Sequence, residues 1–409
     1  MNISKLRFPE FVGEWEMKKL GEVAKFSKGK GISKADIVDD GENECIRYGE
    51  LYTFYGETIK EIKSRTNIAI KDLVLSAAND VIIPASGETQ IDIATASCVL
   101  KSGIALGGDL NIIKTKNNGV FLSYYLNSKK KLEIACLAQG ISVVHLYSSQ
   151  LSLLNLNLPN LPEQTKIATF LTSVDEKLTQ LKKKKSLLEK YKKGVMQKLF
   201  SQELRFKDEN GADFAEWEEK TLGELEIYVS DGNYGELYPR ADQMVSQGVP
   251  FIRANNIKNL RLTMQDMKFI EPKHHEILTS GHLKTGDILV TTRGDIGMLA
   301  YVSEDFNNSN INAQICLLRV SKKLNSIYLL NFLSSRWGVT QFKSMQTGSA
   351  LKQLPKSSLA KVLIKLPSLV EQTKIANFLS AIDDKINQCG VQIEKMEGWK
   401  KGLLQQMFV

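Results

Sequence analysis

Apolar residues follow a seven-residue period in two long stretches of the chain. Alternate steps of four and three residues from Ile167 meet apolar side chains at eight of ten positions, and the same steps from Ile375 meet them at nine of ten. A heptad period of this length predicts two long helices, residues 161–203 and 369–409, that pair along a seam as in a coiled coil. The predicted helix-pairing residues are Ile167, Leu171, Val174, Leu178, Leu181, Leu188, Ile375, Leu379, Ile382, Ile386, Ile393 and Met396.

Two lysines, Lys192 and Lys400, interrupt the predicted seam at corresponding positions. A single polar residue within a seam can fix the register or orientation of the two helices, at some cost in stability. A lysine near the end of a seam can instead lay its alkyl chain on the apolar surface and keep its charge in water. The run of lysines at residues 182–185 also has two interpretations, an ordinary solvated helix face or a surface that attracts DNA phosphates.

The chain contains the same block twice. Residues 163–168, Glu-Gln-Thr-Lys-Ile-Ala, recur as residues 371–376, and the offset of 371 − 163 = 208 residues holds along both predicted helices. The segment that carries Arg7 and Trp15 recurs around Arg205 and Trp217. A repeat of this length is a duplication, because repeat arrays have periods of about 20–50 residues. Two similar halves imply two similar surfaces, and therefore a partner that offers two sites.

Between these blocks the sequence is typical of a mixed α/β domain. Residues 80–83 and 287–290 are short aliphatic runs preceded by turns, so we predict strands there. Residues 121–126 and 328–333 show helical apolar spacing. We therefore predict an α/β (α+β) protein with two similar domains, residues 1–160 and 204–368. In this prediction two long antiparallel coiled-coil helices join the domains, which are related by a pseudo-two-fold.

The composition narrows the class of protein and partner. With 43% hydrophobic and 24% charged residues, the chain is an ordinary globular protein. Lysine and arginine exceed aspartate and glutamate by 54 − 46 = 8, which permits a polyanionic partner such as nucleic acid without establishing one. The five cysteines are scattered, so we expect reduced thiols, no metal site and a cytoplasmic location. We also expect no signal peptide in residues 1–19 and no membrane span.

The doubled pattern of Leu158-Pro159, Glu163-Gln164 and Ile167-Ala168, set between variable regions, resembles the specificity subunit of type I restriction-modification enzymes over the whole chain. The resemblance implies that both variable domains are target recognition domains, each reading one half of a split site in double-stranded DNA. It implies that the long helices space the two halves and dock two methyltransferase (M) subunits, to which two motor-nuclease (R) subunits are added for restriction. S-adenosylmethionine, ATP and magnesium are then expected on the partner subunits, with no cofactor in this chain.

Residues that contact DNA are expected in polar loops of the two domains. Arginine and lysine suit phosphates and guanine, and asparagine suits adenine. The candidate DNA-binding residues are Lys28, Lys30, Arg47, Tyr48, Tyr52 and Ser86 in the first domain, and Asn233, Arg253, Asn255, Asn256, Arg293 and Lys352 in the second. An ordinary surface turn is the alternative for each of them. The matching pair Arg47 and Arg253 could instead be structural arginines tied to a carboxylate.

Sequence motifs for catalysis are missing from the chain. It has no Asn-Pro-Pro-aromatic site of a DNA adenine methyltransferase and no Gly-x-x-x-x-Gly-Lys-Ser/Thr loop of a nucleotide-driven motor. We therefore expect a non-catalytic subunit that depends on its partners for chemistry. Two alternatives stay open at this point: a methyltransferase or nuclease in its own right, and a scaffold whose duplicated domains bind other proteins.

Overall fold

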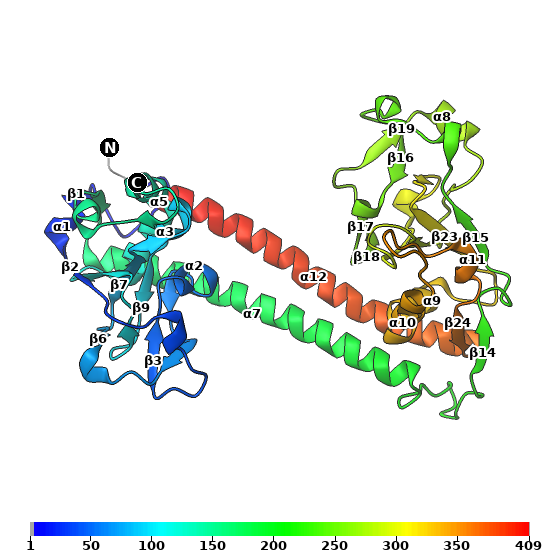
Figure 1. Ribbon diagram of the computed structural model, residues 1–409, viewed down its shortest axis with the longest axis horizontal. Helices are drawn as coiled ribbons and strands as arrows, with labels where there is room; N and C mark the ends of the chain where they lie inside the picture. The colour runs from blue at the N-terminus through cyan, green and yellow to red at the C-terminus, as the bar shows by residue number, and fades with distance from the viewer. Residues whose placement is uncertain (1–3, 409) are drawn as a thin grey trace. The chain divides into compact units, whose positions relative to one another are not determined.

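The computed structural model describes residues 4–408 of the chain, which folds into two compact units. The first unit runs to Lys183 and resumes at Val391, and the second is Lys184–Gly390. Each unit therefore contains a set of strands and short helices together with a part of both long helices (Figure 1). Residues 1–3 and 409, which the predicted domain boundaries include, lie outside the described residues.

The two long helices are α7 (Leu161–Phe200) and α12 (Leu369–Met407), of 40 and 39 residues. They begin six residues before Ile167 and Ile375, the first positions of the heptad pattern, and each has a glutamate in its first turn, where the helix dipole favours negative charge. Within each unit the helices run antiparallel. In the first unit Asp175 pairs with Lys400, and in the second Lys192 pairs with Asp383. Both pairs have the same sum of residue numbers, 175 + 400 = 192 + 383 = 575, as an antiparallel register requires.

The predicted seam residues differ in how far they are buried. The fully buried ones are Ile167, Leu171, Val174, Leu178, Leu181, Ile375, Leu379 and Ile382. The half-buried ones are Leu188, Ile386, Ile393 and Met396. Near its N-terminus each helix also packs under a sheet-containing core, in which Ile167 and Ile375 take part. Leu188 and Ile393 belong to neither of these two cores, so fewer neighbours cover them.

The first unit has three layers: helices, a five-stranded sheet and a four-stranded sheet. The five-stranded sheet has the order β2 (Ala24–Lys28), β11 (Leu110–Thr115), β7 (Asp80–Pro84), β9 (Ser97–Val99), β4 (Thr58–Ile59). The four-stranded sheet has the order β5 (Ser64–Thr66), β3 (Asn43–Ile46), β10 (Ala105–Leu106), β6 (Val74–Leu75). Strand β7 is buried on both faces. Its Val81 and Ile83 pack with helix α4 (Gly119–Ser128), whereas Ile82 packs toward the small sheet, as the two-residue period of a strand dictates.

The second unit repeats these layers with different side chains. Its larger sheet has the order β15 (Tyr228–Asp231), β23 (Ile315–Arg319), β20 (Ile288–Thr291), β21 (Leu299–Tyr301), β18 (Leu260–Leu262), β17 (Ile257–Lys258). Its smaller sheet has the order β19 (Lys268–Ile270), β16 (Val249–Ile252), β22 (Asn310–Ile311). In β20, Ile288 and Val290 face helix α9 (Ser326–Ser334), and Leu289 faces the opposite core.

The predicted fold class is confirmed. The two predicted strands are β7 and β20, and the two predicted short helices lie within α4 and α9. The small sheets also correspond, because β3 pairs with β10 in parallel as β16 pairs with β22. Within residues 4–408, no helix has both the length and the apolar character to cross a membrane.

Candidate nucleic-acid interface

The repeated Glu-Gln block holds each long helix to its own unit. In the first unit the buried Glu163 accepts two hydrogen bonds of 2.7 Å from the Arg7 guanidinium and one of 3.3 Å from the Trp15 indole. In the second unit, Glu371 accepts hydrogen bonds of 3.2 and 3.0 Å from Arg205 and one of 2.9 Å from the Trp217 indole. We call each carboxylate with its arginine and tryptophan the helix anchor of that unit.

The glutamine beside each anchor ties the long helix to the short helix above it. The Gln164 side chain accepts from the backbone N–H of Asn118, just before α4, and donates to the Pro159 carbonyl. Gln372 does the same with Asn325, just before α9, and with the Pro367 carbonyl. The repeated residues are therefore explained by packing. The arginine and tryptophan partners were not predicted, although the parallel repetition of their segments was the signal for them.

The ends of several strands meet at one edge of the larger sheet in each unit. In the first unit, Gly29, just after β2, donates to the carbonyl of Leu110 at 3.0 Å, and Ala85, just after β7, donates to that of Asp109 at 2.8 Å. A side chain at Gly29 would come within 1.9 Å of the Gly107 carbonyl oxygen, so the loop requires glycine. In the second unit a side chain at Gly232 would lie 2.4 Å from the carbonyl oxygen of Ile311. We call these loops at the strand ends, around Gly29 and Ala85 in the first unit and around Gly232 in the second, the sheet edge of each unit.

Three of the six candidate residues of the first unit gather at its sheet edge. Lys28 and Lys30 are exposed on either side of Gly29, and Gly107 donates to the Ile46 carbonyl, which brings Arg47 beside the same loop. The Arg47 Nε lies 3.3 Å from the carboxylate of buried Glu50, which is the kind of partner that a structural role for this arginine requires.

The other three candidates of the first unit have different environments. Tyr48 and Tyr52 are half-buried, and burial together with its neighbour Tyr48 raises the pKa of Tyr52. Ser86 is buried in strand β8 (Ser86–Gly87) and pairs with β12 (Val144–His145). It does not present a side chain to solvent.

The second unit places an exposed arginine at its sheet edge. Arg293 lies over the ring of Tyr234, with 5.5 Å between the guanidinium carbon and the ring centre, a cation–π arrangement. The Tyr234 hydroxyl donates to the Ala313 carbonyl at 2.9 Å, and burial raises its pKa. Lys352 and Asn255 are also exposed. The role of Tyr234 was not predicted from the sequence.

Two predicted contact residues of the second unit are used inside the fold. Asn233 is buried and bonds with its side chain to Thr279 and Ser280. Asn256 is fully buried, accepts from the Arg253 backbone N–H and donates to backbone carbonyls. Their polar atoms are satisfied within the unit, because asparagine closes tight turns of this kind. The Arg253 guanidinium donates to the backbone carbonyl of Asp266 at 2.6 Å. The structural alternative for this arginine had expected a carboxylate as its partner. The interface proposed below leaves out Asn233, Asn256 and Ser86.

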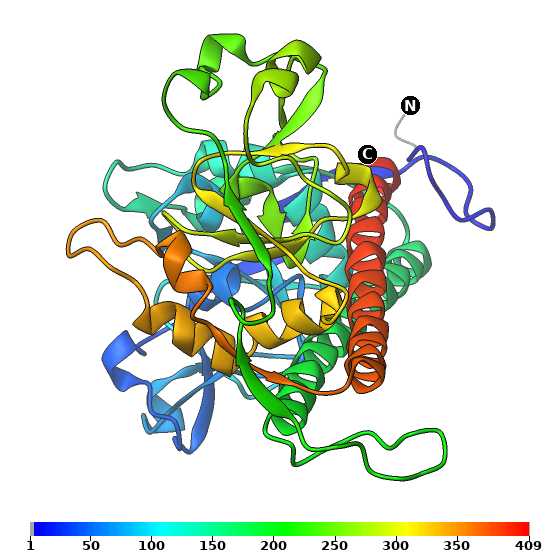
Figure 2. The same ribbon diagram turned by 90° about the vertical axis from the view of Figure 1, so that its right-hand side faces the viewer.

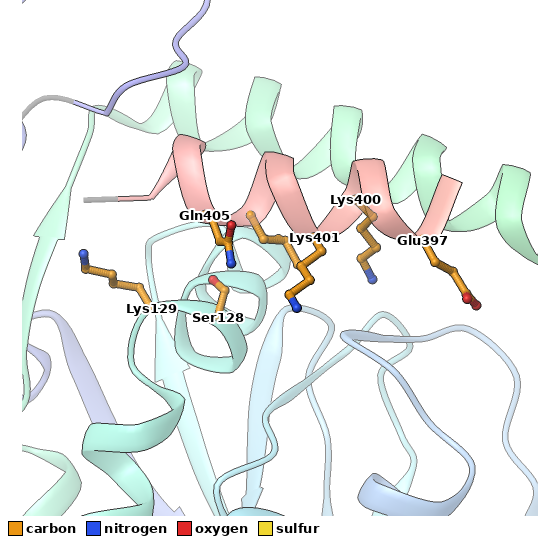
Figure 3. A pocket seen from close by; sticks show the side chains of 7 residues that line it. Ser128, Lys129, Glu397, Lys400, Lys401 and Gln405 are labelled. Carbon is orange, nitrogen blue, oxygen red and sulfur yellow. The ribbon is translucent and has the colours of Figure 1, made fainter. Parts of the chain in front are cut away.

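A polar groove lies along α12 in the first unit, where the side chains of Lys400, Lys401 and Gln405 extend from the helix toward the end of α4 (Figure 3). Its volume is about 510 Å³. Its lining residues are Ser128, Lys129, Glu397, Lys400, Lys401, Leu404 and Gln405. The residues at the corresponding sequence positions in the second unit are Ser335, Arg336, Glu189, Lys192, Lys193, Met196 and Gln197. Five of these seven positions carry the same residue in both units, although the sheet edges have diverged.

Comparison with known proteins accounts for both copies. The family model described as the type I restriction modification DNA specificity domain matches residues 13–190 and again residues 215–394. The chain belongs to this family of type I specificity subunits. Each unit contains most of one match, so the subunit has two recognition domains.

Individual relatives are similar to this chain over nearly its whole length. The specificity subunit of the MjaVIII type I restriction enzyme from Methanocaldococcus jannaschii is 26% identical, covering 98% of this chain and 92% of that protein. The putative MjaX specificity subunit of the same organism is 24% identical over 98% of this chain and 95% of that protein. The crystal structure of a type I restriction-modification S subunit from M. genitalium has the same fold, with a TM-score of 0.68 and 17% identity over 100% of this chain and 99% of that one.

Proposed function

We propose that this specificity subunit is a non-catalytic reader of double-stranded DNA, and that each unit reads one half of a bipartite site through its sheet edge. In this proposal two methyltransferase subunits bind the chain, and two motor-nuclease subunits complete the restriction enzyme in the cytoplasm. S-adenosylmethionine, ATP and magnesium belong to those partners. The two long helices, each about 60 Å at 1.5 Å per residue, set the number of base pairs between the half-sites.

The observation that supports the proposal most strongly is that the two sheet edges share one backbone framework but carry side chains of different charge. Lys28 pairs with Asn111 across β2 and β11, and Asp231 pairs with Cys316 across β15 and β23, so Lys28 and Asp231 occupy equivalent places. Ser86 and Arg293 also occupy equivalent places, because each pairs with the last residue of a short hairpin, His145 and Gln353 respectively. A lysine in one unit and an aspartate in the other offer different groups to base edges, and the exposed Arg293 stands where the first unit has a buried serine. The two half-sites should therefore differ in sequence.

The polar groove supports the proposal of two identical protein partners. Five of its seven lining residues recur at the corresponding sequence positions, as expected where each unit meets the same molecule. The exposed aromatic residues Trp399 and Tyr191 also occupy corresponding positions on α12 and α7. Exposed Trp and Tyr are enriched among residues that contribute most to protein–protein binding. We therefore propose that one methyltransferase subunit binds this groove and that a second binds the corresponding residues of the second unit.

Adenine methylation in a host cell tests the proposal most directly. Single-molecule sequencing of the genome, with and without this gene, should reveal a methylated bipartite motif that depends on the gene and has two different halves. Light scattering of the purified complex should give two methyltransferase subunits per chain, and the isolated chain should transfer no methyl groups to DNA. A genome methylated equally without the gene, or activity of the isolated chain, would contradict the proposal.

A further inference from the structure

Each unit carries a short hairpin at its sheet edge, which we call the tip loop, residues 139–145 in the first unit and 347–353 in the second. The first is closed by reciprocal backbone hydrogen bonds between Gln139 and His145 of 2.9 and 2.7 Å. The second is closed by the same bonds between Thr347 and Gln353, both of 2.9 Å. Behind each loop the next leucine is buried and donates to the strand that leads to the sheet edge, Leu146 to Ala85 and Leu354 to Thr292.

Both tip loops bend at a glycine with a positive φ angle. Gly140 and Gly348 follow the first closing residue, with φ values of +124° and +91° that side chains rarely adopt. A side chain at either glycine would also come within 2.4 Å of a carbonyl oxygen across the loop. The second tip loop is the orange loop that projects from its unit in Figure 2. Both loops are thus defined structures that hold their outermost residues away from the core.

The outermost residues of both tip loops are aliphatic and exposed. Ile141 is 100% exposed and Leu351 is 89% exposed, while Val143, at the position equivalent to Leu351, is 51% exposed. One exposed aliphatic residue carries little information, because much of any protein surface is apolar. Here the loop sequences have diverged, Ile-Ser-Val against Ser-Ala-Leu, yet both keep a large aliphatic group in water. Because exposing a large aliphatic side chain to water is unfavourable, its presence in both loops despite their different sequences indicates that the two loops share a function.

The surroundings of the tip loops point to DNA as the molecule that covers them. Lys28 and Lys30 lie at the sheet edge of the first unit, and Arg293 pairs directly with Gln353 at the base of the second tip loop, with Lys352 beside it. Cationic groups of this kind hold the phosphate backbone in register, whereas sequence is read in the grooves. A two-stranded ribbon fits the major groove, where an aliphatic side chain can contact a thymine methyl group. Aliphatic side chains also enter between base pairs in the minor groove.

We propose that the two tip loops enter a groove of their respective half-sites and that Ile141 and Leu351 make apolar contacts with bases there. This inference rests on the proposed function, because it names residues that would determine specificity within the same DNA-reading surface. It assigns Ile141 to the half-site read by the first unit and Leu351 to the half-site read by the second.

The test uses the full chain assembled with its methyltransferase subunits and the duplex that the wild-type complex methylates. Ile141→Ser and Leu351→Ser should each weaken binding of that duplex roughly tenfold in fluorescence anisotropy, the usual cost of one mismatched base pair. In methylation sequencing, each should relax the base preference in one half of the motif only. Leu351→Met, which keeps an apolar side chain, should retain the preference. Because both residues are exposed, the variants should keep the wild-type melting temperature.

Leu132→Ser and Val339→Ser are matched controls, because these exposed aliphatic residues occupy corresponding positions on α5 (Lys131–Leu137) and α10 (Arg336–Ser344). They should change binding by no more than about twofold, as surface substitutions usually do. If the wild-type complex is sequence-specific and both tip variants bind and methylate as it does, the inference is wrong and the proposed function stands. If the wild-type complex itself shows no sequence preference, the proposed function fails and this inference fails with it.

Discussion

The helix anchors and the sheet edges of this chain have diverged to very different extents. At the anchors, glutamate, arginine and tryptophan recur in both units with the same hydrogen bonds, Glu163 with Arg7 and Glu371 with Arg205. At the sheet edges the backbone framework recurs, but Lys28 is replaced by Asp231. Both regions descend from one duplicated sequence and lie in the same two units. The difference therefore reflects what each region must satisfy.

The anchors meet the same requirement twice, because each holds a long helix under its own sheet. A buried carboxylate needs an ion-pair partner and several hydrogen bonds, and few residue combinations supply both. In the proposed function each sheet edge meets a different half-site, so its exposed side chains are free to differ, whereas Gly29 and Gly232 are fixed by close backbone contacts. Identity between the copies is thus explained at the anchors by packing, and divergence on a common framework is what the proposed recognition of two different half-sites predicts.

The largest expected effect comes from breaking an anchor. Glu163→Ala and Glu371→Ala should each lower the free energy of unfolding of their own unit by about 3–5 kcal/mol, because each leaves a largely buried arginine without its carboxylate. Hydrogen exchange should then become faster in α4 for the first variant and in α9 for the second. Glu219→Ala, an exposed residue of strand β14 (Glu218–Thr221), is the control and should have no such effect. Unequal losses from the two anchor substitutions would show that the anchors are not equivalent.

A smaller and more selective effect is expected at the sheet edge. Arg293→Ala should weaken DNA binding by the assembled complex by about 1–3 kcal/mol, since an arginine that contacts guanine contributes this much. The side chain is exposed, so thermal stability should be unchanged. Methylation sequencing should show relaxed preference in one half of the motif. Lys207→Ala, an exposed lysine outside the sheet edge, is the control. Relaxation in both halves would contradict the assignment of one half-site to each unit.

The elements that the sequence allowed us to predict are those set by local apolar patterns. The heptad positions from Ile167 and Ile375 predicted the long helices, and the aliphatic runs predicted β7 and β20. The parallel pairing of β3 with β10 was beyond such reasoning, because it joins residues about 60 positions apart through strands of four and two residues. The strand register aligns Lys28 with Asp231 residue by residue.

The candidate site was harder to predict than the fold, because a polar residue in a loop gives no sign of its burial. Asn255 and Asn256 are adjacent, yet the first is exposed and the second is fully buried in a turn. Arg47 and Arg253 are aligned in sequence, yet one faces a carboxylate and the other a backbone carbonyl. Which polar group meets solvent depends on contacts between distant segments, and those contacts follow from the folded topology.

The smallest expected effect concerns a lysine that the two units use differently. Lys400 lies between Asp175 and Glu57, at 2.7 and 3.3 Å, whereas its counterpart Lys192 pairs with Asp383. Burial alone would lower the pKa of Lys400, but the two carboxylates outweigh it and raise that pKa above its ordinary value. A raised pKa in the folded state contributes stability that is fully present below the unfolded pKa of about 10.4 and is lost as pH rises through the folded value.

Urea unfolding between about pH 8 and 11 should therefore show a steeper loss of stability at the alkaline end for the wild-type chain than for Lys400→Met. Buried Tyr124, whose hydroxyl donates to Asp175, also has a raised pKa and destabilises the fold at high pH, so the variant should keep part of the slope. Lys401→Met removes the neighbouring exposed lysine and should match the wild type. Identical slopes for Lys400→Met and the wild type would mean that the ion pairs of Lys400 contribute nothing to the stability of the first unit.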